Sequence, residues 1–154
     1  MSDSPKITAP DLTQRPPRSV RCRLGGYVTL PRILDKGRAT IAGTNGEYNY
    51  DAPFDQHLIK FLGLDPAALR EQLAVDQSDG EILAWINAHA KEKRTPWEIE
   101  QWSEYMLHRG PDSDEETLTF FLKRVGSFTK TREDIKTWMD LLDVDDYVTF
   151  GGKP

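Results

Sequence analysis

Helix-start signals recur along this chain, and they constrain its fold more than any other feature of the sequence. In a capping box, a Ser or Thr hydroxyl accepts a hydrogen bond from the backbone N–H three residues later, and the Glu at that position reaches back to the first N–H. Three such boxes are present, at Ser78–Glu81, Thr95–Glu98 and Ser113–Glu116. They predict a mainly α-helical chain.

Apolar residues at helical spacing follow each box, and the same pattern follows Pro31, Asp55 and Asp65-Pro66. Pro suits the first turn of a helix and Asp suits its N-cap. Thr131–Asp134 is a weaker box, because Asp replaces the usual Glu. We therefore predict a compact single-domain fold of about six or seven helices, near residues 31–42, 55–63, 66–75, 79–92, 96–109, 114–126 and 132–142.

The N-terminal stretch is predicted to be an extended arm. Proline disfavours helix and pushes the residue before it toward extended geometry, and Gly25-Gly26 marks a turn after the arm. The prolines concerned are Pro5, Pro10, Pro16 and Pro17. We divide the chain into a flexible N-terminus (1–10), a single helical domain (11–150) and a short tail (151–154).

Composition excludes several classes of protein. No stretch approaches the roughly 18 consecutive apolar residues that a membrane span needs, and the first 19 residues lack the apolar run of a secretory signal. Cys22 is the single cysteine, so no intramolecular disulfide can form, and we expect a cytoplasmic protein without a membrane partner. Because His57, His89 and His108 lie far apart in the sequence, we expect no metal site.

Charge is distributed unevenly along the chain. Residues 1–45 hold eight cations and three acids, a net charge of +5, whereas the rest of the chain has a net charge of −10. Two interpretations are open: the basic front pairs with the acidic back, within one fold or across a dimer, or the front forms an anion-binding face. The overall charge of −5 argues against a nucleic-acid partner.

The richest cluster of polar side chains runs through residues 30–57. Cations and phenols within a short reach are what a pocket for anions needs. The segment 47–51 alternates like a short strand or an extended loop, which would put both of its tyrosines on one side. The candidate ligand-binding residues are Arg32, Lys36, Arg38, Tyr48 and Tyr50, and the candidate general bases are Asp35, Glu47, Asp51 and Asp55.

A structural interpretation stands beside each of these residues. The charged side chains of 32–38 lie largely off the apolar stripe, where they could pair with one another at helical spacing on a solvated face. Asp55 suits an N-cap, and either tyrosine suits a core position with its hydroxyl satisfied. The acidic run Asp143–Asp146 is most simply a solvated turn.

The chain contains none of the common catalytic motifs. The glycines at 43 and 46 match neither a phosphate loop nor a dinucleotide-binding fingerprint, and no nucleophile elbow or His-Glu-x-x-His pair is present. Cys22 lies between Arg21 and Arg23, whose charges would favour the thiolate, but no histidine is near in sequence to act with it. The sequence thus points to no cofactor and no reaction.

Several short motifs together resemble the bacterial family catalogued as domain of unknown function 5069, over nearly the whole chain. They are Asp11-Leu12 with Arg15-Pro16-Pro17-Arg18, Leu24-Gly25-Gly26-Tyr27, Leu30-Pro31-Arg32, Asp35-Lys36-x-Arg38-Ala39, Gly46-Glu47-Tyr48-x-Tyr50-Asp51-x-Pro53-x-Asp55, Phe61-Leu62-Gly63 and Asp134-Ile135-x-Thr137-Trp138-x-Asp140-Leu141-Leu142-Asp143. Ala52 stands where relatives often have cysteine, and Gly37 where they often have alanine. The resemblance supports the predicted fold and implies no activity.

Three functions remain open from the sequence. The first is a domain that binds a small anionic metabolite, or an acidic segment of a partner, through Arg32, Arg38 and the two tyrosines. The second is an enzyme with one of the four carboxylates as general base and Arg32 or Lys36 as the charge stabiliser. The third is a structural module that forms a homodimer through its aromatic helices.

Overall fold

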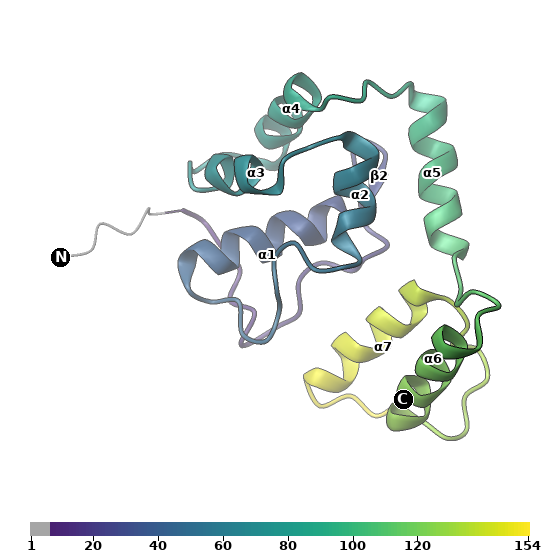
Figure 1. Cartoon of the computed structure of the whole chain (residues 1–154). Coiled ribbons are helices and arrows are strands. Elements are labelled where there is room, and N and C mark those ends of the chain that lie inside the picture. The colour runs from purple at the N-terminus through teal and green to yellow at the C-terminus, as the bar shows by residue number, and fades with distance from the viewer. Residues whose placement is uncertain (1–6) are drawn as a thin grey trace.

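The computed structural model describes residues 7–154, and this part of the chain is mainly helical, as predicted. A two-stranded antiparallel sheet precedes the first helix (Figure 1). The elements are β1 (Arg23–Leu24), β2 (Tyr27–Val28), α1 (Leu30–Ala42), α2 (Asp55–Leu62), α3 (Pro66–Leu73), α4 (Asp79–His89), α5 (Pro96–His108), α6 (Glu115–Phe128) and α7 (Trp138–Thr149).

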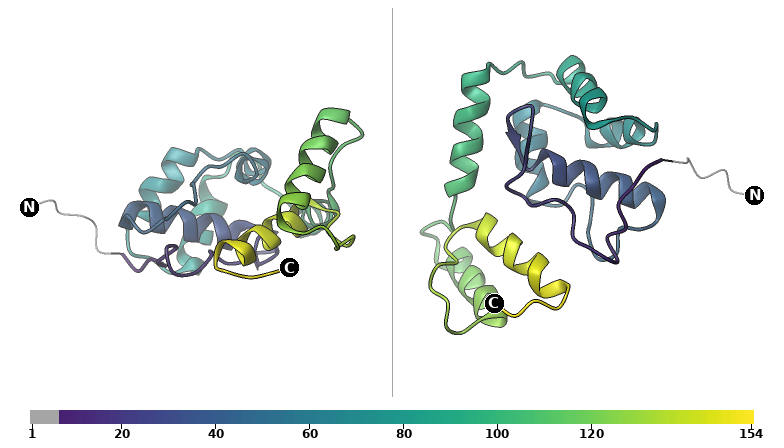
Figure 2. Two further views of the ribbon diagram at one scale, coloured as in Figure 1. Left: turned by 90° about the horizontal axis from the view of Figure 1, so that it is seen from below. Right: turned by 180° about the vertical axis from the view of Figure 1, so that it is seen from behind.

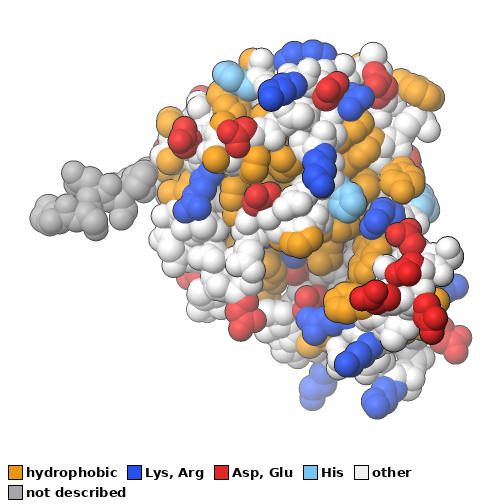
Figure 3. Space-filling model, in the orientation of Figure 1, with side chains coloured by type: hydrophobic (Ala, Val, Ile, Leu, Met, Phe, Trp, Pro, Cys, Tyr) orange, Lys and Arg blue, Asp and Glu red, His pale blue; other side chains and the backbone are white. Residues whose placement is uncertain are grey.

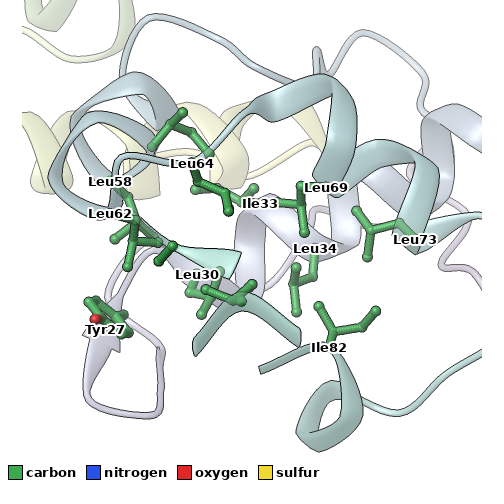
Figure 4. Close-up of a cluster of buried hydrophobic side chains, with 13 residues drawn as sticks. Tyr27, Leu30, Ile33, Leu34, Leu58, Leu62, Leu64, Leu69, Leu73 and Ile82 are labelled. Atoms are coloured by element: carbon green, nitrogen blue, oxygen red, sulfur yellow. The ribbon is translucent and has the colours of Figure 1, made fainter. Parts of the chain in front are cut away.

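Helix α1 lies at the centre of the molecule, with α2, α3 and α4 on one side and α7 on another (Figures 1 and 2). Its apolar residues Leu30, Ile33 and Leu34 join the main hydrophobic core, to which α2, α3 and α4 also contribute (Figure 4). Neighbours on several sides bury most of the helix, including three of its charged side chains. The alternative interpretation, in which these charges pair with one another on a solvated face, is therefore wrong.

A missing side chain allows α3 to approach α1 closely. A Cβ atom at Gly37 would lie 2.5 Å from Cδ1 of Leu73 and 3.4 Å from the ring of Tyr50. The first distance is far shorter than an ordinary carbon–carbon contact, and the second is at the lower edge of the ordinary range. The glycine therefore makes room for a leucine of α3 in the core.

The sequence allowed either a short strand or an extended loop at residues 47–51. The β structure of the described chain lies elsewhere. That segment forms turns, and Asp51 has a positive φ of 58°. The strands are instead β1 and β2, which pair through Arg23↔Val28 and Leu24↔Tyr27. Gly25 and Gly26 between them have φ values of 60° and 84°, so the predicted turn closes a hairpin.

The caps of α4 and α5 form as the sequence predicts, and the caps of the last two helices differ. Ser78 and Thr95 each make a complete capping box. Helix α6 is capped by Asp114 instead of Ser113. Helix α7 begins after Thr137, whose box partner is Asp140.

The prediction of a helix at 132–142 is therefore wrong in its bounds. The carboxylate of Asp134 binds the side chain of Arg132, so it is not available to cap a helix. Ile135 is buried with Phe121 and Leu141 between α6 and α7. This cluster holds the segment before α7 against the middle of α6, and the helix starts three residues after Ile135.

The arm runs along α1 without forming a helix. Of the predicted flexible N-terminus, residues 1–6 lie outside the described part of the chain. The backbone N–H of Thr8 donates to Asp76, and the carbonyl of Pro10 accepts from Thr44. Leu12 is buried, and its N–H donates to the carbonyl of Thr44. The arm is thus tied to the loop that follows α1.

Helices α6 and α7 lie side by side at one end of the molecule and run in roughly the same direction (Figure 2), with Phe121 against Trp138 and Arg124 beside Asp145. Helix α7 contacts the N-terminal part, where Met139 shares a small core with Val20, Val28 and Met106. Helix α6 buries little besides Phe121 and packs mainly on α7. Among the helices of residues 7–154, none is long and apolar enough to cross a membrane.

Candidate functional site

A pocket of about 320 Å³ lies between the N-terminal helices and the C-terminal pair. Figure 3 shows the molecule hollowed in this region, with hydrophobic side chains in the depth of the hollow. The walls come from α1, from the turns before α2, from the start of α2, and from α6 and α7. The lining residues are Arg32, Lys36, Glu47, Tyr48, Asn49, Ala52, Phe54, Asp55, Arg124, Leu142, Asp145 and Thr149.

The first buried ion pair of the pocket joins α1 to α7. The guanidinium of Arg32 donates from Nη1 to Oδ2 of Asp146 at 2.6 Å and from Nη2 to Oδ1 at 3.0 Å. Both side chains are at most a tenth exposed. Burial works against the charged guanidinium, but the hydrogen bonds and charge of Asp146 outweigh it and raise the pKa of Arg32. Both terminal nitrogens of Arg32 are therefore already hydrogen-bonded within the protein.

Tyr48 extends this ion pair to the wall of the pocket. Its hydroxyl donates to Oδ1 of Asp146 at 2.9 Å, and the guanidinium carbon of Arg32 lies 5.5 Å from the centre of its ring. Burial, together with the negative charge of Asp146, raises the pKa of the phenol. Tyr48 therefore keeps its proton at neutral pH and holds the acceptor in place.

The second buried ion pair lies one turn along α1. Nζ of Lys36 donates to Oδ2 of Asp55 at 2.6 Å, and that oxygen also accepts from the backbone N–H of Ala52 at 3.0 Å. Both side chains are almost fully buried. Burial lowers the pKa of Lys36 despite the opposing effect of the Asp55 charge. An ammonium has three N–H donors, and Asp55 is the one acceptor that Lys36 finds among residues 7–154.

The opposite wall of the pocket carries an ion pair that is longer and more exposed than the first two. Arg124 of α6 is about half exposed, and its Nη2 lies 3.5 Å from Oδ2 of Asp145. Its guanidinium carbon lies 4.7 Å from the ring centre of Phe128. A pair this long and exposed contributes little to stability, so the guanidinium can turn toward a bound group at small cost.

Two of the sequence candidates on α1 lie away from the pocket. Asp35 accepts hydrogen bonds from the backbone and side chain of Arg18 in the arm. Arg38 donates to Asp79 at the start of α4 and to the carbonyl of Gln77. Burial acts to raise the pKa of Asp79, but the hydrogen bonds from the two arginines lower it overall. Both candidates therefore fasten α1 to its neighbours.

Two candidates after α1 also lie outside the lining. The hydroxyl of Tyr50 donates to the carbonyl of Pro66 at 2.7 Å, and its ring packs against the core. Burial and the charges of nearby acids raise the pKa of Tyr50. Oδ1 of Asp51 is buried without a hydrogen-bond partner among the described residues. Of the nine candidates, the pocket brings together Arg32, Lys36, Glu47, Tyr48 and Asp55.

The C-terminal half of the pocket was missed by the sequence argument. Asp146 was assigned to a solvated turn, but it is buried within α7. Arg124 and Leu142 gave no signal beyond helical spacing. The excess of acids after residue 45 was the available indication, since it predicted that basic residues of the front would find partners in the back.

The single cysteine and two of the histidines lie away from the pocket. Cys22 is half-buried and lines none of the pockets described for residues 7–154. Nδ1 of His89 and of His108 each lies 2.8 Å from a carbonyl oxygen one turn earlier in its own helix. No three His, Cys, Asp or Glu side chains in the described part of the chain gather as a metal site would require.

Comparison with known proteins identifies the family of the chain but assigns no activity to it. The family described as "Domain of unknown function (DUF5069)" matches residues 14–148. No curated protein matches the chain with significant similarity. The matched range contains every element from β1 to α6, nearly all of α7, and eleven of the twelve residues that line the pocket. The chain therefore belongs to the DUF5069 family.

Proposed function

We propose that the pocket binds a small organic anion, a carboxylate or a phosphate. The observation that carries the proposal is the ammonium of Lys36, which is buried in the wall of an open pocket with a single acceptor among the described residues. A buried ammonium with unused donors favours a ligand that supplies both acceptor atoms and negative charge. The volume suits a small metabolite better than a segment of a protein partner.

The two arginines have different roles in this proposal. Arg32 is engaged at both terminal nitrogens by Asp146, so it positions α7 and does not clamp the ligand. Arg124 is the second cation for the ligand, because its own partner is distant and exposed. Its planar fork can donate two parallel hydrogen bonds to a carboxylate or a phosphate.

Catalysis by a general base fits this arrangement less well. Asp55 is the buried carboxylate of the pocket, but its charge is held by Lys36 at 2.6 Å. The same oxygen, Oδ2, also accepts from the backbone N–H of Ala52, so it is already engaged twice within the protein. Glu47 is exposed, and the other two carboxylates lie outside the pocket lining. Binding therefore requires fewer assumptions than an enzyme does.

A panel of anions tests the proposal by thermal shift and titration calorimetry. The panel holds acetate, succinate, inorganic phosphate and glycerol 3-phosphate. A ligand at a hundredfold excess over its dissociation constant stabilises the protein by about 2.7 kcal/mol, which corresponds to roughly 5–11 °C at this chain length. If none of these anions raises the melting temperature at millimolar concentration, the proposal is wrong.

A matched pair of variants locates the binding. Arg124→Ala removes a half-exposed side chain of the pocket, so it should leave the fold intact and weaken binding roughly tenfold or more, as expected for loss of a charge-assisted hydrogen bond. Lys123→Ala removes the neighbouring exposed cation, which lies outside the pocket, and should leave the affinity unchanged. Equal losses in the two variants would indicate a general effect of charge.

Dimerisation remains as a second candidate because α5 exposes two large aromatic side chains. Trp97 is 70% exposed and Tyr105 is 63% exposed. Residues eight apart on a helix lie on neighbouring parts of its surface. Light scattering of the wild type and of Trp97→Ala tests this role, and a monomeric wild type at high concentration would exclude it.

A further inference from the structure

A second hollow of about 330 Å³ adjoins the polar pocket. The two share four wall residues, Phe54, Arg124, Leu142 and Asp145, so they adjoin between α2 and the helices α6 and α7. We call the first hollow the polar compartment and the second the apolar compartment. Because the two compartments adjoin, a molecule that reaches past the shared side chains would occupy both.

The apolar compartment is walled mainly by hydrocarbon. Phe54, Leu141 and Leu142 contribute to its walls together with Phe120 and Trp138. Trp138 packs edge to face on Phe121, with ring centres 5.0 Å apart, so one wall is a fixed aromatic surface. Phe120, another wall residue, is 60% exposed. A hydrophobic group in this compartment would remove from water an aromatic ring that otherwise remains solvated.

Charge is confined to the boundary between the compartments and to the polar end. Arg124 and Asp145 lie in both, and His57 is the other titratable residue of the apolar compartment. Burial, with the positive charges of Arg109 and Lys60, lowers the pKa of His57. Its imidazole is therefore uncharged at neutral pH, and the apolar compartment offers a fixed charge only where it meets the polar one.

From this geometry we infer that the ligand is an amphipathic anion. Its carboxylate or phosphate lies in the polar compartment with Lys36 and Arg124, and an aryl or alkyl group lies in the apolar compartment against Phe120 and Trp138. The inference rests on the proposed function and narrows it from anions in general to anions with a hydrophobic group. Simple anions of the same head group would bind, but more weakly.

A series of ligands with a common head group tests the inference by calorimetry. The probes are acetate, hexanoate and 3-phenylpropanoate, with 3-phenylpropanol as the uncharged analogue. Each methylene moved from water to an apolar wall improves the affinity by about fourfold. We therefore expect 3-phenylpropanoate to bind at least tenfold more tightly than acetate and more tightly than 3-phenylpropanol.

Two variants on α6 connect this gain to the apolar compartment. Phe120→Ala should weaken 3-phenylpropanoate several-fold and leave acetate unchanged, because the ring lines the apolar compartment and not the polar one. Leu122→Ala is the control, since Leu122 is equally exposed on α6 and lines neither compartment. The same loss in both variants would overturn the inference.

The remaining outcomes separate the inference from the proposed function. If acetate and 3-phenylpropanoate bind equally well, the inference is wrong and the anion site stands. If 3-phenylpropanol binds as tightly as the carboxylate, the anionic head group is unnecessary and both fail. If no carboxylate binds and the phosphates of the earlier panel also fail, the proposed function itself is wrong.

Discussion

Replacing Asp146 by alanine should destabilise the protein far more than the same change at Asp143, one turn earlier on α7. Both carboxylates pair with an arginine from the N-terminal part of the chain. The side chains of Asp146 and Arg32 are 10% and 6% exposed, whereas those of Asp143 and Arg21 are 34% and 39% exposed. The two variants therefore differ mainly in whether they strand a buried charge.

The magnitude follows from that burial. Breaking a buried ion pair by removing one partner costs roughly 3–5 kcal/mol, because the remaining charge is left uncompensated. In Asp146→Ala the stranded group is the guanidinium of Arg32, and Tyr48 loses its acceptor as well. An exposed pair such as Asp143 with Arg21 is worth about 0–1 kcal/mol. Since total stability is about 5–15 kcal/mol, the first loss is a large fraction of it.

Thermal and urea denaturation, followed by circular dichroism, measure both changes. At about 2–4 °C per kcal/mol, Asp146→Ala should lower the melting temperature by roughly 6–20 °C and Asp143→Ala by no more than about 4 °C. Asp146→Asn keeps an acceptor for Tyr48 without the charge, so it should fall between them. Similar losses for Asp146→Ala and Asp143→Ala would refute the reasoning that burial sets the cost.

Three further predictions concern other parts of the molecule. Lys36→Met should cost roughly 3–5 kcal/mol by urea denaturation, and adding Asp55→Asn should recover most of it while anion binding stays lost; no recovery would contradict the assignment of a buried pair. The free energy of unfolding should fall as pH rises above about 10, because burial raises the pKa of Tyr50 and the unfolded chain loses that proton first; Tyr50→Phe should make the fall between pH 9 and pH 11 shallower. Thr95→Ala should lower stability by about 0.5–2 kcal/mol, against no change for the exposed Thr119→Ala.

The sequence predicted the helices best where the signals were local. Ser78 and Thr95 each meet their capping partner three residues away, so nothing distant decides whether the box forms. The start of α7 depended on a distant contact. Thr131–Asp134 and Thr137–Asp140 offer the same pattern, and the choice between them follows from packing around Ile135.

Half of the candidate site was predictable, because the cluster at 30–57 supplies five of its lining residues: Arg32, Lys36, Glu47, Tyr48 and Asp55. The other half depends on pairing between residues far apart in the sequence. Asp146 lies 114 residues from Arg32, and its burial cannot be read from the acidic run in which it occurs. Composition left two interpretations of the uneven charge open, and the first of them, pairing of the basic front with the acidic back, is the one found: six cations of the front each pair with an acid after residue 45, namely Arg18, Arg21, Arg23, Arg32, Lys36 and Arg38.

The same ion pairs explain why a pocket exists at this position in the fold. Each charged side chain of α1 takes its partner from a different element: Asp35 from the arm, Lys36 from α2 and Arg38 from α4. Buried pairs of this kind add little stability over apolar residues of similar size, but they restrict the arrangements in which every charge is compensated. Arg32 imposes the corresponding restriction on α7. Because Arg32 of the pair to α7 and both members of the pair to α2 line the pocket, charges that fix the positions of these helices also provide polar surface available to a ligand.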